Sequence, residues 1–194
     1  FGIPIHAKFL KIYENDILCR KFGLNQNKFT VLITTGSFGM GPIEEIIDLL
    51  YNDVQILVIC ANNKRLYARL KNRNYPNVSV FGFVDYAQEL MAVSDMIITK
   101  PGGLTISESL AMELVPIFIS PIPGQETQNL KALEKYGVGY RPKALKYIKD
   151  IVMDYKEHPD KLNKIKEKIR AIKKPDALKE LCDVVCGSRV GVSG

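Results

Sequence analysis

The sequence has no tryptophan, two histidines and four cysteines among its 194 residues. So few cysteines exclude a small secreted scaffold held together by disulfides, and they favour a cytosolic protein. The cysteines are Cys19, Cys60, Cys182 and Cys186. The last two lie four residues apart on an expected helix, but no third or fourth ligand lies nearby, so the sequence predicts no zinc site.

Long hydrophobic runs are also absent. The longest, residues 56–61, is far shorter than the roughly 18 residues that a membrane-spanning helix needs. Residues 1–11 have neither the basic start nor the apolar centre of a signal peptide. Because the chain begins with Phe1 and not with methionine, we expect it to be a processed or excised piece of a longer protein. Its composition, 46% hydrophobic and 25% charged, is that of an ordinary globular domain.

Positive charge is concentrated in one part of the chain. The formal net charge is +6, and residues 141–180 account for all of the excess. Such a run is most often a solvated helical face. The alternative is attraction to an anionic membrane surface, where each basic residue near the lipid contributes about 1 kcal/mol. We expect no nucleic-acid partner, because the segment holds only Tyr147 and Tyr155 for base stacking.

Strand-like apolar runs recur from residue 29 onward, with helical patterns between them. Most are uninterrupted, which is typical of strands buried on both faces. The sequence therefore predicts an α/β fold, a Rossmann-like doubly wound parallel sheet of about six strands with C-terminal helices. The strands are expected at residues 29–34, 55–61, 78–81, 96–99, 116–119 and 137–140.

The same patterns divide the chain into three parts. Residues 1–28 are interpreted as a linker that leads into the sheet domain. Residues 29–142 form the expected sheet domain, and residues 143–194 form basic helices that pack on it. Prolines separate these last helices, which fits their helix-breaking character.

Glycine-rich loops follow two of the expected strands. The first, residues 34–42, spaces its glycines as G-x-x-G-x-G and places Pro42 at the start of a helix. Glycines let a backbone approach a phosphate, and the free amides of a helix N-terminus favour an anion. The spacing matches neither the dinucleotide fingerprint nor a P-loop. This loop alone therefore leaves two interpretations open, an anion-binding loop or a tight turn.

The second glycine-rich loop, residues 99–108, carries Gly102 and Gly103 directly before a helix. Thr105 and Glu108 lie on one face of the first helical turn, where a capping box is one interpretation. In the other, Glu108 accepts hydrogen bonds from a vicinal diol such as ribose, while the amides of residues 103–105 face a phosphate. Two anion-binding helix ends in one cleft indicate a nucleotide diphosphate.

A third polar stretch, residues 121–129, follows the fifth expected strand and begins a helix. It is rich in amide and carboxylate side chains, which are suited to sugar hydroxyls. Polar capping residues at a helix N-terminus would have the same composition, so both interpretations remain open.

Together these segments resemble a known family. A glycine-rich loop, Gly-Phe-Val at 82–84, Lys-Pro-Gly-Gly-x-Thr-x-x-Glu at 100–108 and Pro-Gly-Gln-Glu at 123–126 occur in this order. The order resembles the C-terminal half of bacterial processive diacylglycerol glucosyltransferases. These are related to the plant monogalactosyldiacylglycerol synthases and, more distantly, to the peptidoglycan lipid-intermediate N-acetylglucosaminyltransferase. The likeness runs from about residue 2, where Gly-Ile-Pro-Ile is similar to the family's interdomain junction, to about residue 142.

The resemblance implies the donor domain of a two-domain glycosyltransferase of the GT-B class, with residues 29–142 binding a UDP-sugar. The diphosphate contacts that it implies are Gly36, Ser37, Phe38, Gly39, Lys100, Gly102, Gly103, Leu104 and Thr105. Uracil would meet Phe83 and Val84, and Glu108 would bind ribose. Gln125, Glu126 and Gln128 would face the donor sugar. Thr35 departs from the glycine that is common in the family before the centre of the first loop.

The family chemistry implies inverting transfer of a hexose to a diacylglycerol-type lipid. No Asp-x-Asp occurs in the sequence, so we expect no metal and no cofactor besides the donor, with helix N-termini and Lys100 stabilising the leaving diphosphate. His6 and His158 are interpreted as surface residues, which leaves no convincing general base. In the family, the base and the lipid-binding surface belong to an N-terminal domain. We therefore expect this chain alone to bind UDP-sugar without turning it over.

The resemblance leaves several alternatives open. The acceptor could be a polyprenyl-linked lipid with N-acetylglucosamine as the sugar, or the scaffold could serve a UDP-sugar epimerase. The chain could also be a stand-alone donor-binding subunit that docks on a separate acceptor subunit. The family implies a peripheral position on the cytoplasmic face of the membrane. Glucose and galactose differ at one hydroxyl, and Gln125 or Glu126 could serve either.

Overall fold

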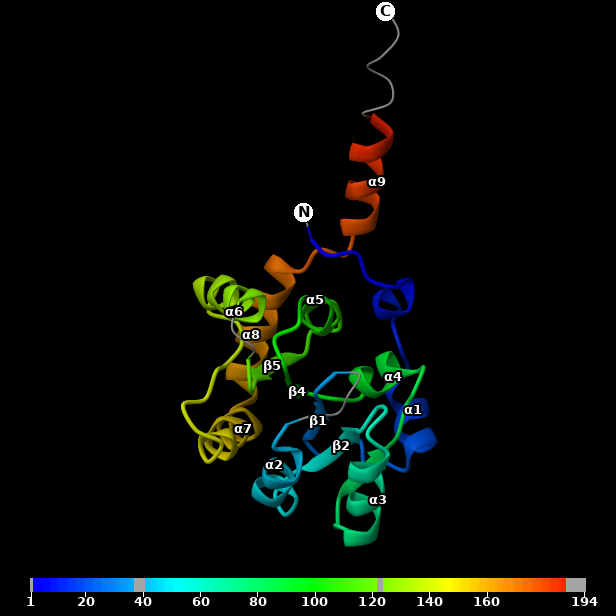
Figure 1. Ribbon diagram of the computed structural model, residues 1–194, viewed down its shortest axis with the longest axis vertical. Helices are drawn as coiled ribbons and strands as arrows, with labels where there is room; N and C mark the ends of the chain where they lie inside the picture. Colours follow the sequence, from blue (N-terminus) through cyan, green and yellow to red (C-terminus); the bar gives the residue numbers. More distant parts are fainter. Residues whose placement is uncertain (1, 37–40, 122–123, 188–194) are drawn as a thin grey trace, which may run out of the picture.

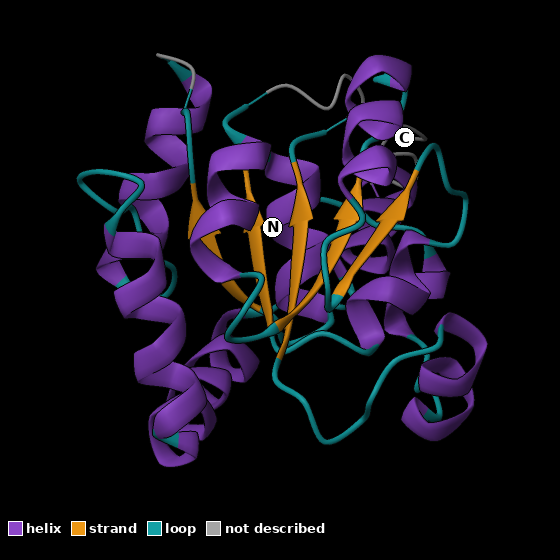
Figure 2. Cartoon of the chain, turned by 90° about the horizontal axis from the view of Figure 1, so that it is seen from below, coloured by secondary structure: helices purple, strands orange, loops and turns teal. Residues whose placement is uncertain are grey.

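The structure is a computed structural model, and it describes residues 2–36, 41–121 and 124–187. Within these residues, five parallel strands form one sheet in the order β3-β2-β1-β4-β5 (Figure 1, Figure 2). The strands are β1 (Thr30–Thr34), β2 (Gln55–Ile59), β3 (Val78–Phe81), β4 (Met96–Thr99) and β5 (Val115–Phe118). The predicted doubly wound parallel sheet is confirmed.

Helices cover both faces of this sheet (Figure 2). They are the 3-10 helix η1 (Ala7–Leu10) and the α-helices α1 (Asn15–Phe22), α2 (Ile43–Leu50), α3 (Lys64–Arg73), α4 (Ala87–Ala92), α5 (Gly103–Ala111), α6 (Gln125–Lys135), α7 (Tyr147–Glu157), α8 (Pro159–Ile172) and α9 (Ala177–Gly187).

Alternate residues of β1 point to opposite faces of the sheet, and each face has its own core. Val31 and Ile33 join one buried cluster, with side chains from α2, α3, α7 and α8. Leu32 joins the other, with Leu90 of α4 and Phe9 of η1. Because both faces are covered, the strand has no polar side, which explains its uninterrupted apolar sequence.

Strand β1 pairs with β2 on one side and with β4 on the other. The chain therefore crosses from one half of the sheet to the other between β3 and β4. Ile33 pairs with Ile98, and each of them stands one residue before the end of its strand. The two strands thus end side by side, at the point where sheets of this kind bind their ligands.

The sixth expected strand, residues 137–140, is wrong. Gly137 and Gly139 have φ angles of 61° and 82°, which are left-handed and not extended. Only Tyr140 bridges to the sheet, as a single isolated partner of Ile117. Gly139 also packs closely on β5, since a Cβ there would lie 2.6 Å from Cε2 of Phe118. The segment runs beside β5 without adding a strand.

The amino-terminal segment, residues 2–28, packs on the sheet domain. Phe9 of η1 is 4% exposed, and the ring of Phe22 in α1 stacks on Tyr86. Ile3 lies against Gly103 at the start of α5, where an added Cβ would be 2.6 Å from Cδ1 of Ile3. Residues that the sequence presents as a linker therefore contact the loops at the carboxyl end of the sheet.

The basic C-terminal helices differ from one another in their packing. Helix α7 contacts α2, and α8 contacts α5 and β5, with Ile148, Val152 and Ile169 completely buried. Helix α9 extends away from the sheet (Figure 1), and after the buried Ala177 its large apolar side chains, such as Leu181, are exposed. Among the helices of the described residues, none combines the length and the apolar character needed to cross a bilayer.

Candidate functional site

Four of the loops that leave the carboxyl edge of the sheet carry or adjoin predicted site residues: the β1 loop (35–42), the β3 loop (82–86), the β4 loop (100–102) and the β5 loop (119–124). The β1 and β4 loops follow neighbouring strands, and the β5 loop follows the strand next to β4. The amide of Ile119 donates to the carbonyl oxygen of Thr99 at 2.9 Å, so the β4 and β5 loops begin side by side. The two glycine-rich loops therefore share one edge, as the sequence predicts.

The β1 loop lies only partly within the described residues, and Ser37, Phe38 and Gly39 fall outside them. Thr35 is 4% exposed, and its Oγ1 has no hydrogen-bond partner in the described part of the chain. Gly36 is exposed, with a φ of 78° that glycine adopts without strain. The chain thus leaves β1 through a buried threonine.

Gly102 and Gly103 are glycines for different reasons. A Cβ on Gly103, the first residue of α5, would meet Cδ1 of Ile3 at 2.6 Å, and the tip of this half-exposed side chain would have to move aside. Gly102, the N-cap, has an ordinary φ of −69°, and apart from its chain neighbours no described residue has an atom within 4 Å of the place where its Cβ would be. A side chain at 103 therefore displaces Ile3, whereas one at 102 meets no described residue. Gly102 opens free space before the N-terminus of α5, where an anion is favoured.

Of the two interpretations of Thr105 and Glu108, the capping box is wrong. The N-cap of α5 is Gly102, no side chain caps this helix, and Thr105 is its third residue. The carbonyl oxygen of Thr105 accepts a hydrogen bond from Oγ of Ser109 at 2.6 Å, while Leu104 is 53% exposed. The first amides of α5 thus keep their capacity to bind an anion.

Glu108 lies half-buried in the second turn of α5. Burial raises the pKa of its carboxyl from 4.5 to about 7, and the positive charge of Lys8 opposes this effect. Among the described residues, its side chain makes no hydrogen bond or ion pair. An ionised carboxylate without protein partners can accept two hydrogen bonds from a vicinal diol.

The β3 loop presents an aromatic side chain to solvent. Phe83 is 73% exposed, whereas Val84 packs partly buried against the core that contains Leu90. The carbonyl oxygen of Asp85 accepts a hydrogen bond from Nζ of Lys8 at 2.7 Å. The amino-terminal segment, which is not part of the sheet, is therefore hydrogen-bonded to the β3 loop through Lys8.

The first turn of α6 carries the three polar residues that were predicted to face a sugar. Gln125 and Gln128 are exposed, and Glu126 is half-buried. Nδ2 of Asn129, in the next turn, donates to the carbonyl oxygen of Pro101 at 2.9 Å. This bond joins α6 to the β4 loop and brings the predicted sugar-binding and diphosphate-binding segments together.

The sequence did not single out Lys8 or Asp85 as contributors to this edge, and it included Asn129 only as the last residue of the polar stretch 121–129. Asn129 lies four residues after Gln125, on the same helical face, and this spacing could have identified it. Lys8 and Asp85 are 77 residues apart. No local pattern connects them, because their contact forms only when η1 packs on the sheet domain.

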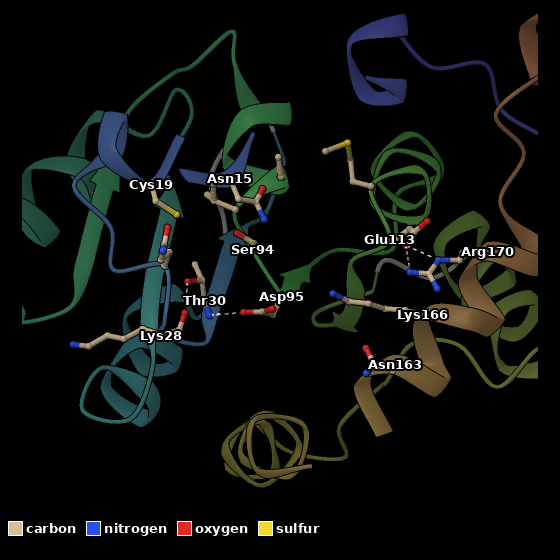
Figure 3. A pocket seen from close by; sticks show the side chains of 14 residues that line it. Asn15, Cys19, Lys28, Thr30, Ser94, Asp95, Glu113, Asn163, Lys166 and Arg170 are labelled. Carbon is tan, nitrogen blue, oxygen red and sulfur yellow. Dashed lines mark hydrogen bonds and ion pairs between the residues drawn. The ribbon is translucent and has the colours of Figure 1, made fainter. Parts of the chain in front are cut away.

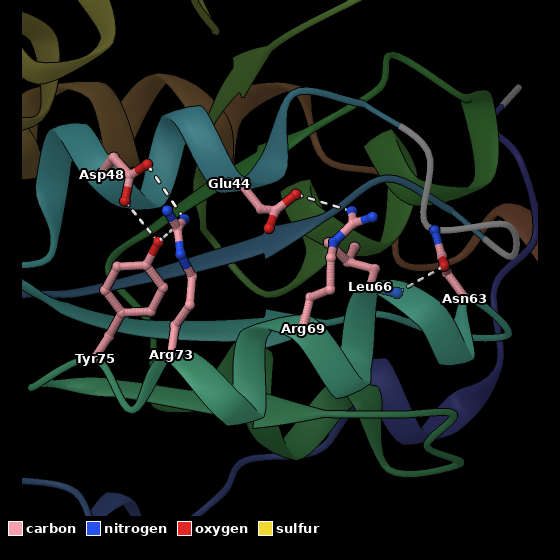
Figure 4. Close-up of polar contacts among 7 residues, drawn as sticks. All are labelled: Glu44, Asp48, Asn63, Leu66, Arg69, Arg73 and Tyr75. Carbon is pink, nitrogen blue, oxygen red and sulfur yellow. Dashed lines mark hydrogen bonds and ion pairs between the residues drawn. The ribbon is translucent and has the colours of Figure 1, made fainter.

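Polar contacts on the outer surface fix α2, the helix that follows the β1 loop (Figure 4). Arg69 of α3 pairs with Glu44 at 2.8 Å. Oη of Tyr75 donates to Oδ1 of Asp48 at 2.6 Å, and Arg73 contacts both groups. Burial, followed by the neighbouring Asp48, raises the pKa of Tyr75 to about 12. These contacts tie α2 to α3 along its length.

A polar cavity of about 310 Å³ lies at the opposite, amino end of β1 and β4 (Figure 3). Oδ2 of Asp95 accepts a hydrogen bond from the amide of Thr30 at 2.8 Å. Burial raises the pKa of Asp95, while this bond and the charge of Lys166 oppose the rise. Glu113 pairs with Arg170 at 2.8 Å. The two carboxylates of this cavity thus have cationic partners in the same cavity, away from the four loops.

Comparison with known proteins now identifies the family. The glycosyltransferase family 28 C-terminal domain matches residues 30–181. A processive diacylglycerol beta-glucosyltransferase of Bacillus cereus (strain ATCC 10987 / NRS 248) is 32% identical over 192 residues, which cover 95% of this chain and 49% of that protein. The chain therefore spans about half the length of this relative.

Solved structures share the fold. MurG of Acinetobacter baumannii aligns with a TM-score of 0.68 and 16% identity, over 92% of this chain and 55% of that one. Anabaena HepE, solved in complex with UDP-glucose, aligns with a TM-score of 0.64 and 19% identity, over 87% of this chain and 50% of that one. Both show the fold of GT-B glycosyltransferases. The chain belongs to glycosyltransferase family 28, whose C-terminal domain makes up residues 30–181.

Proposed function

We propose that this chain is the donor-binding part of an inverting, metal-independent glycosyltransferase that transfers a hexose from a UDP-sugar to a diacylglycerol-type lipid. One arrangement carries the proposal. Two glycine-rich loops follow the neighbouring strands β1 and β4 and lead into α2 and α5, with Glu108 in the second turn of α5. The Bacillus cereus relative, a diacylglycerol glucosyltransferase, and the UDP-glucose complex of HepE support this choice of donor and acceptor.

In the proposed complex, the diphosphate lies between the N-terminal ends of α2 and α5. Gly36 and Gly102 let the backbone approach it, and Lys100 adds positive charge. Glu108 accepts hydrogen bonds from both ribose hydroxyls, and its ionised form is the one that binds. The β3 loop, through Phe83, covers the uracil ring.

The donor sugar, in this proposal, faces the first turn of α6. Gln125 and Gln128 are exposed there, so their amide groups are available to sugar hydroxyls. The Asn129–Pro101 hydrogen bond sets the distance between this turn and the diphosphate loop. The hexose would therefore lie between α6 and the β4 loop, with its anomeric carbon directed out of the domain.

Inverting transfer then proceeds in one displacement. An acceptor hydroxyl attacks the anomeric carbon from the face opposite UDP, and the new glycosidic bond forms as the bond to the diphosphate oxygen breaks. The hydroxyl proton passes to a general base, and UDP leaves with the bonding electrons. The growing negative charge on the diphosphate is stabilised by the helix N-termini and by Lys100, which are already in place.

The base and the acceptor site, in this proposal, belong to parts of the enzyme outside this chain, since the chain spans about half of its relative. The whole enzyme would act at the cytoplasmic face of the membrane as a peripheral protein, where its lipid acceptor lies. Exposed lysines of α8, such as Lys164 and Lys168, are available to anionic lipid.

Equilibrium binding of nucleotides to this chain tests the donor. UDP and UDP-glucose should compete for one site, and CMP should bind at least tenfold more weakly. Equal affinity for CMP and UDP would contradict the assignment of a UDP-sugar. A clear preference for UDP-N-acetylglucosamine over UDP-glucose and UDP-galactose would favour the polyprenyl-linked acceptor instead.

A transfer assay tests whether this chain binds the donor but lacks the base and the acceptor site. The chain, mixed with radiolabelled UDP-glucose and diacylglycerol vesicles, should bind the donor and form no labelled lipid. The longer polypeptide should form it. Labelled glycolipid made by the isolated chain would show that the base and the acceptor site lie within these 194 residues.

A further inference from the structure

Lys8 occupies a fixed position in the amino-terminal segment. Nδ1 of His6 accepts a hydrogen bond from the Lys8 amide at 3.1 Å, and Oη of Tyr13 donates to the Lys8 carbonyl oxygen at 2.7 Å. The next residue, Phe9, is buried in the core. The backbone of Lys8 is therefore held on both sides, which directs its side chain to one place.

That side chain reaches two separate parts of the candidate site. Nζ donates to the carbonyl oxygen of Asp85 in the β3 loop at 2.7 Å. Its charge also acts on the carboxylate of Glu108, and η1 contacts α5, which carries Glu108. The β3 loop and α5 follow strands that are separated by two others, β2 and β1. The amino-terminal segment therefore spans the distance between the β3 loop and α5, and Lys8 lies in the part of it that contacts both.

Among the charged groups on the elements packed around Glu108, Lys8 is the one whose charge affects its carboxylate in the described part of the chain. Helix α5 contains no charged residue besides Glu108 itself. Helix α8, which packs against α5, directs Arg170 and Lys173 to Glu113 at the far end of α5. Strand β5, also packed on α5, has no charged residue. Lys8 is the cation whose charge acts on the Glu108 carboxylate among the described residues.

We infer that Lys8 is a positioning residue for the nucleoside half of the donor: its ammonium group bonds the β3 loop while η1 packs on α5, so that the loop and Glu108 keep the relative geometry that uracil and ribose require. The inference rests on the proposed function. Lys8 acts through the backbone carbonyl of Asp85 and through the charge that favours ionised Glu108, and in this proposal it does not touch the diphosphate. Its removal should therefore weaken the binding of nucleosides and leave the binding of inorganic diphosphate unchanged.

The test compares three variants of the whole chain. Lys8→Met keeps the length of the side chain and removes its charge, and Lys8→Arg restores the charge. Lys11→Met removes a charge from an exposed residue in the same segment and serves as the matched control. Circular dichroism and thermal unfolding establish that each variant is folded before binding is measured.

Calorimetry with UDP and with pyrophosphate gives the first readout. We expect Lys8→Met to bind UDP about tenfold more weakly, a loss typical of one charge-assisted hydrogen bond. Its pyrophosphate affinity should stay within about twofold of wild type, Lys8→Arg should recover most of the UDP affinity, and Lys11→Met should match wild type. Equal losses for UDP and pyrophosphate, or no loss of UDP affinity, would overturn the inference.

Carboxyl-carbon NMR of Glu108 in the ligand-free chain gives a second readout that needs no nucleotide. The pKa of Glu108 should be higher in Lys8→Met than in wild type, because an attractive positive charge is lost. An unchanged pKa would overturn the electrostatic interaction between Lys8 and Glu108. A raised pKa in a chain that fails to bind UDP would overturn the proposed function and the positioning role together, while the electrostatic contact itself would stand.

Discussion

Asn129 and Pro101 connect two segments that bind the donor in our proposal. Nδ2 of Asn129 on α6 donates to the carbonyl oxygen of Pro101 in the β4 loop at 2.9 Å. Asn129 also lies 3.8 Å from the position that a Cβ on Gly103 would take. The start of α5 is therefore fixed from two sides, by Ile3 of the amino-terminal segment and by Asn129 of α6.

Replacing Asn129 with alanine should weaken donor binding. Loss of this hydrogen bond releases the β4 loop from α6, with a cost of about 1 kcal/mol in unfolding free energy and about a fivefold drop in UDP affinity. Lys131→Ala, at an exposed position of the same helix, is the control and should change neither. Chemical denaturation and calorimetry measure the two effects. Wild-type affinity in Asn129→Ala would show that the bond does not set the site's geometry.

Alanine substitutions at Gly102 and Gly103 should affect different properties. Gly102→Ala adds a methyl group in open space, so the unfolding free energy should fall by less than about 1 kcal/mol, while UDP affinity drops at least tenfold. Gly103→Ala displaces the half-exposed tip of Ile3 and should cost about 1 kcal/mol of stability. The double variant Gly103→Ala/Ile3→Ala should regain part of that stability. A stable Gly102→Ala chain with full UDP affinity would rule out close approach of a phosphate at this residue.

Glu108 should make the fold less stable as the pH rises. Its pKa in the folded chain, about 7, exceeds the ordinary value of 4.5, so the folded state holds this proton more tightly than the unfolded state. The resulting stabilisation is complete below pH 4.5 and is lost as the pH rises to about 7. Relative to wild type, Glu108→Gln should therefore gain about 1 to 2 kcal/mol at pH 8 compared with pH 4, after allowance for solvent screening. Urea unfolding at the two pH values measures this, and a gain at pH 4 instead would contradict the direction of the shift.

Glu113 should show the opposite pH dependence. Its carboxylate pairs with Arg170 of α8 and with Lys173, which directly follows this helix. Although burial opposes them, these partners hold the pKa of Glu113 below 4.5. This stabilisation is present above pH 4.5 and is lost as the pH falls through the lowered pKa. Glu113→Gln should cost about 1 kcal/mol at pH 7, and the difference from wild type should shrink at pH 3. A constant difference across this range would show that the ion pairs contribute nothing.

The strands were the most predictable part of the fold. Residues 78–81 and 96–99 are strands with the expected bounds. For 96–99 the reason is full burial, because a strand covered on both faces has an uninterrupted apolar sequence. The segment 137–140 carries apolar and aromatic residues too, yet Gly137 and Gly139 adopt left-handed angles that interrupt pairing. Composition alone does not tell a glycine within a strand from a glycine that ends one.

The candidate site was predictable where its residues are close in sequence. Gly102 and Glu108 fall within one short motif, and the structure places that motif at the crossing point of the sheet. The contact between Gly103 and Ile3 could not be predicted from the sequence, because it forms only through tertiary packing. The contact between Lys8 and Asp85 was hidden for the same reason. Contacts of this kind depend on how η1 packs on the sheet domain, and no local sequence pattern predicts that packing.

A calorimetric titration with UDP at pH 8, where Glu108 is ionised, tests most directly whether this chain contains a donor site. We expect one saturable site in the wild-type chain, and at least a tenfold loss of affinity in a folded Glu108→Gln variant. Glu113→Gln, whose carboxylate lies away from the loops, should bind UDP as wild type does. A folded wild-type chain that shows no binding, or equal affinity in wild type and Glu108→Gln, would contradict the proposal that these loops and Glu108 hold the nucleotide.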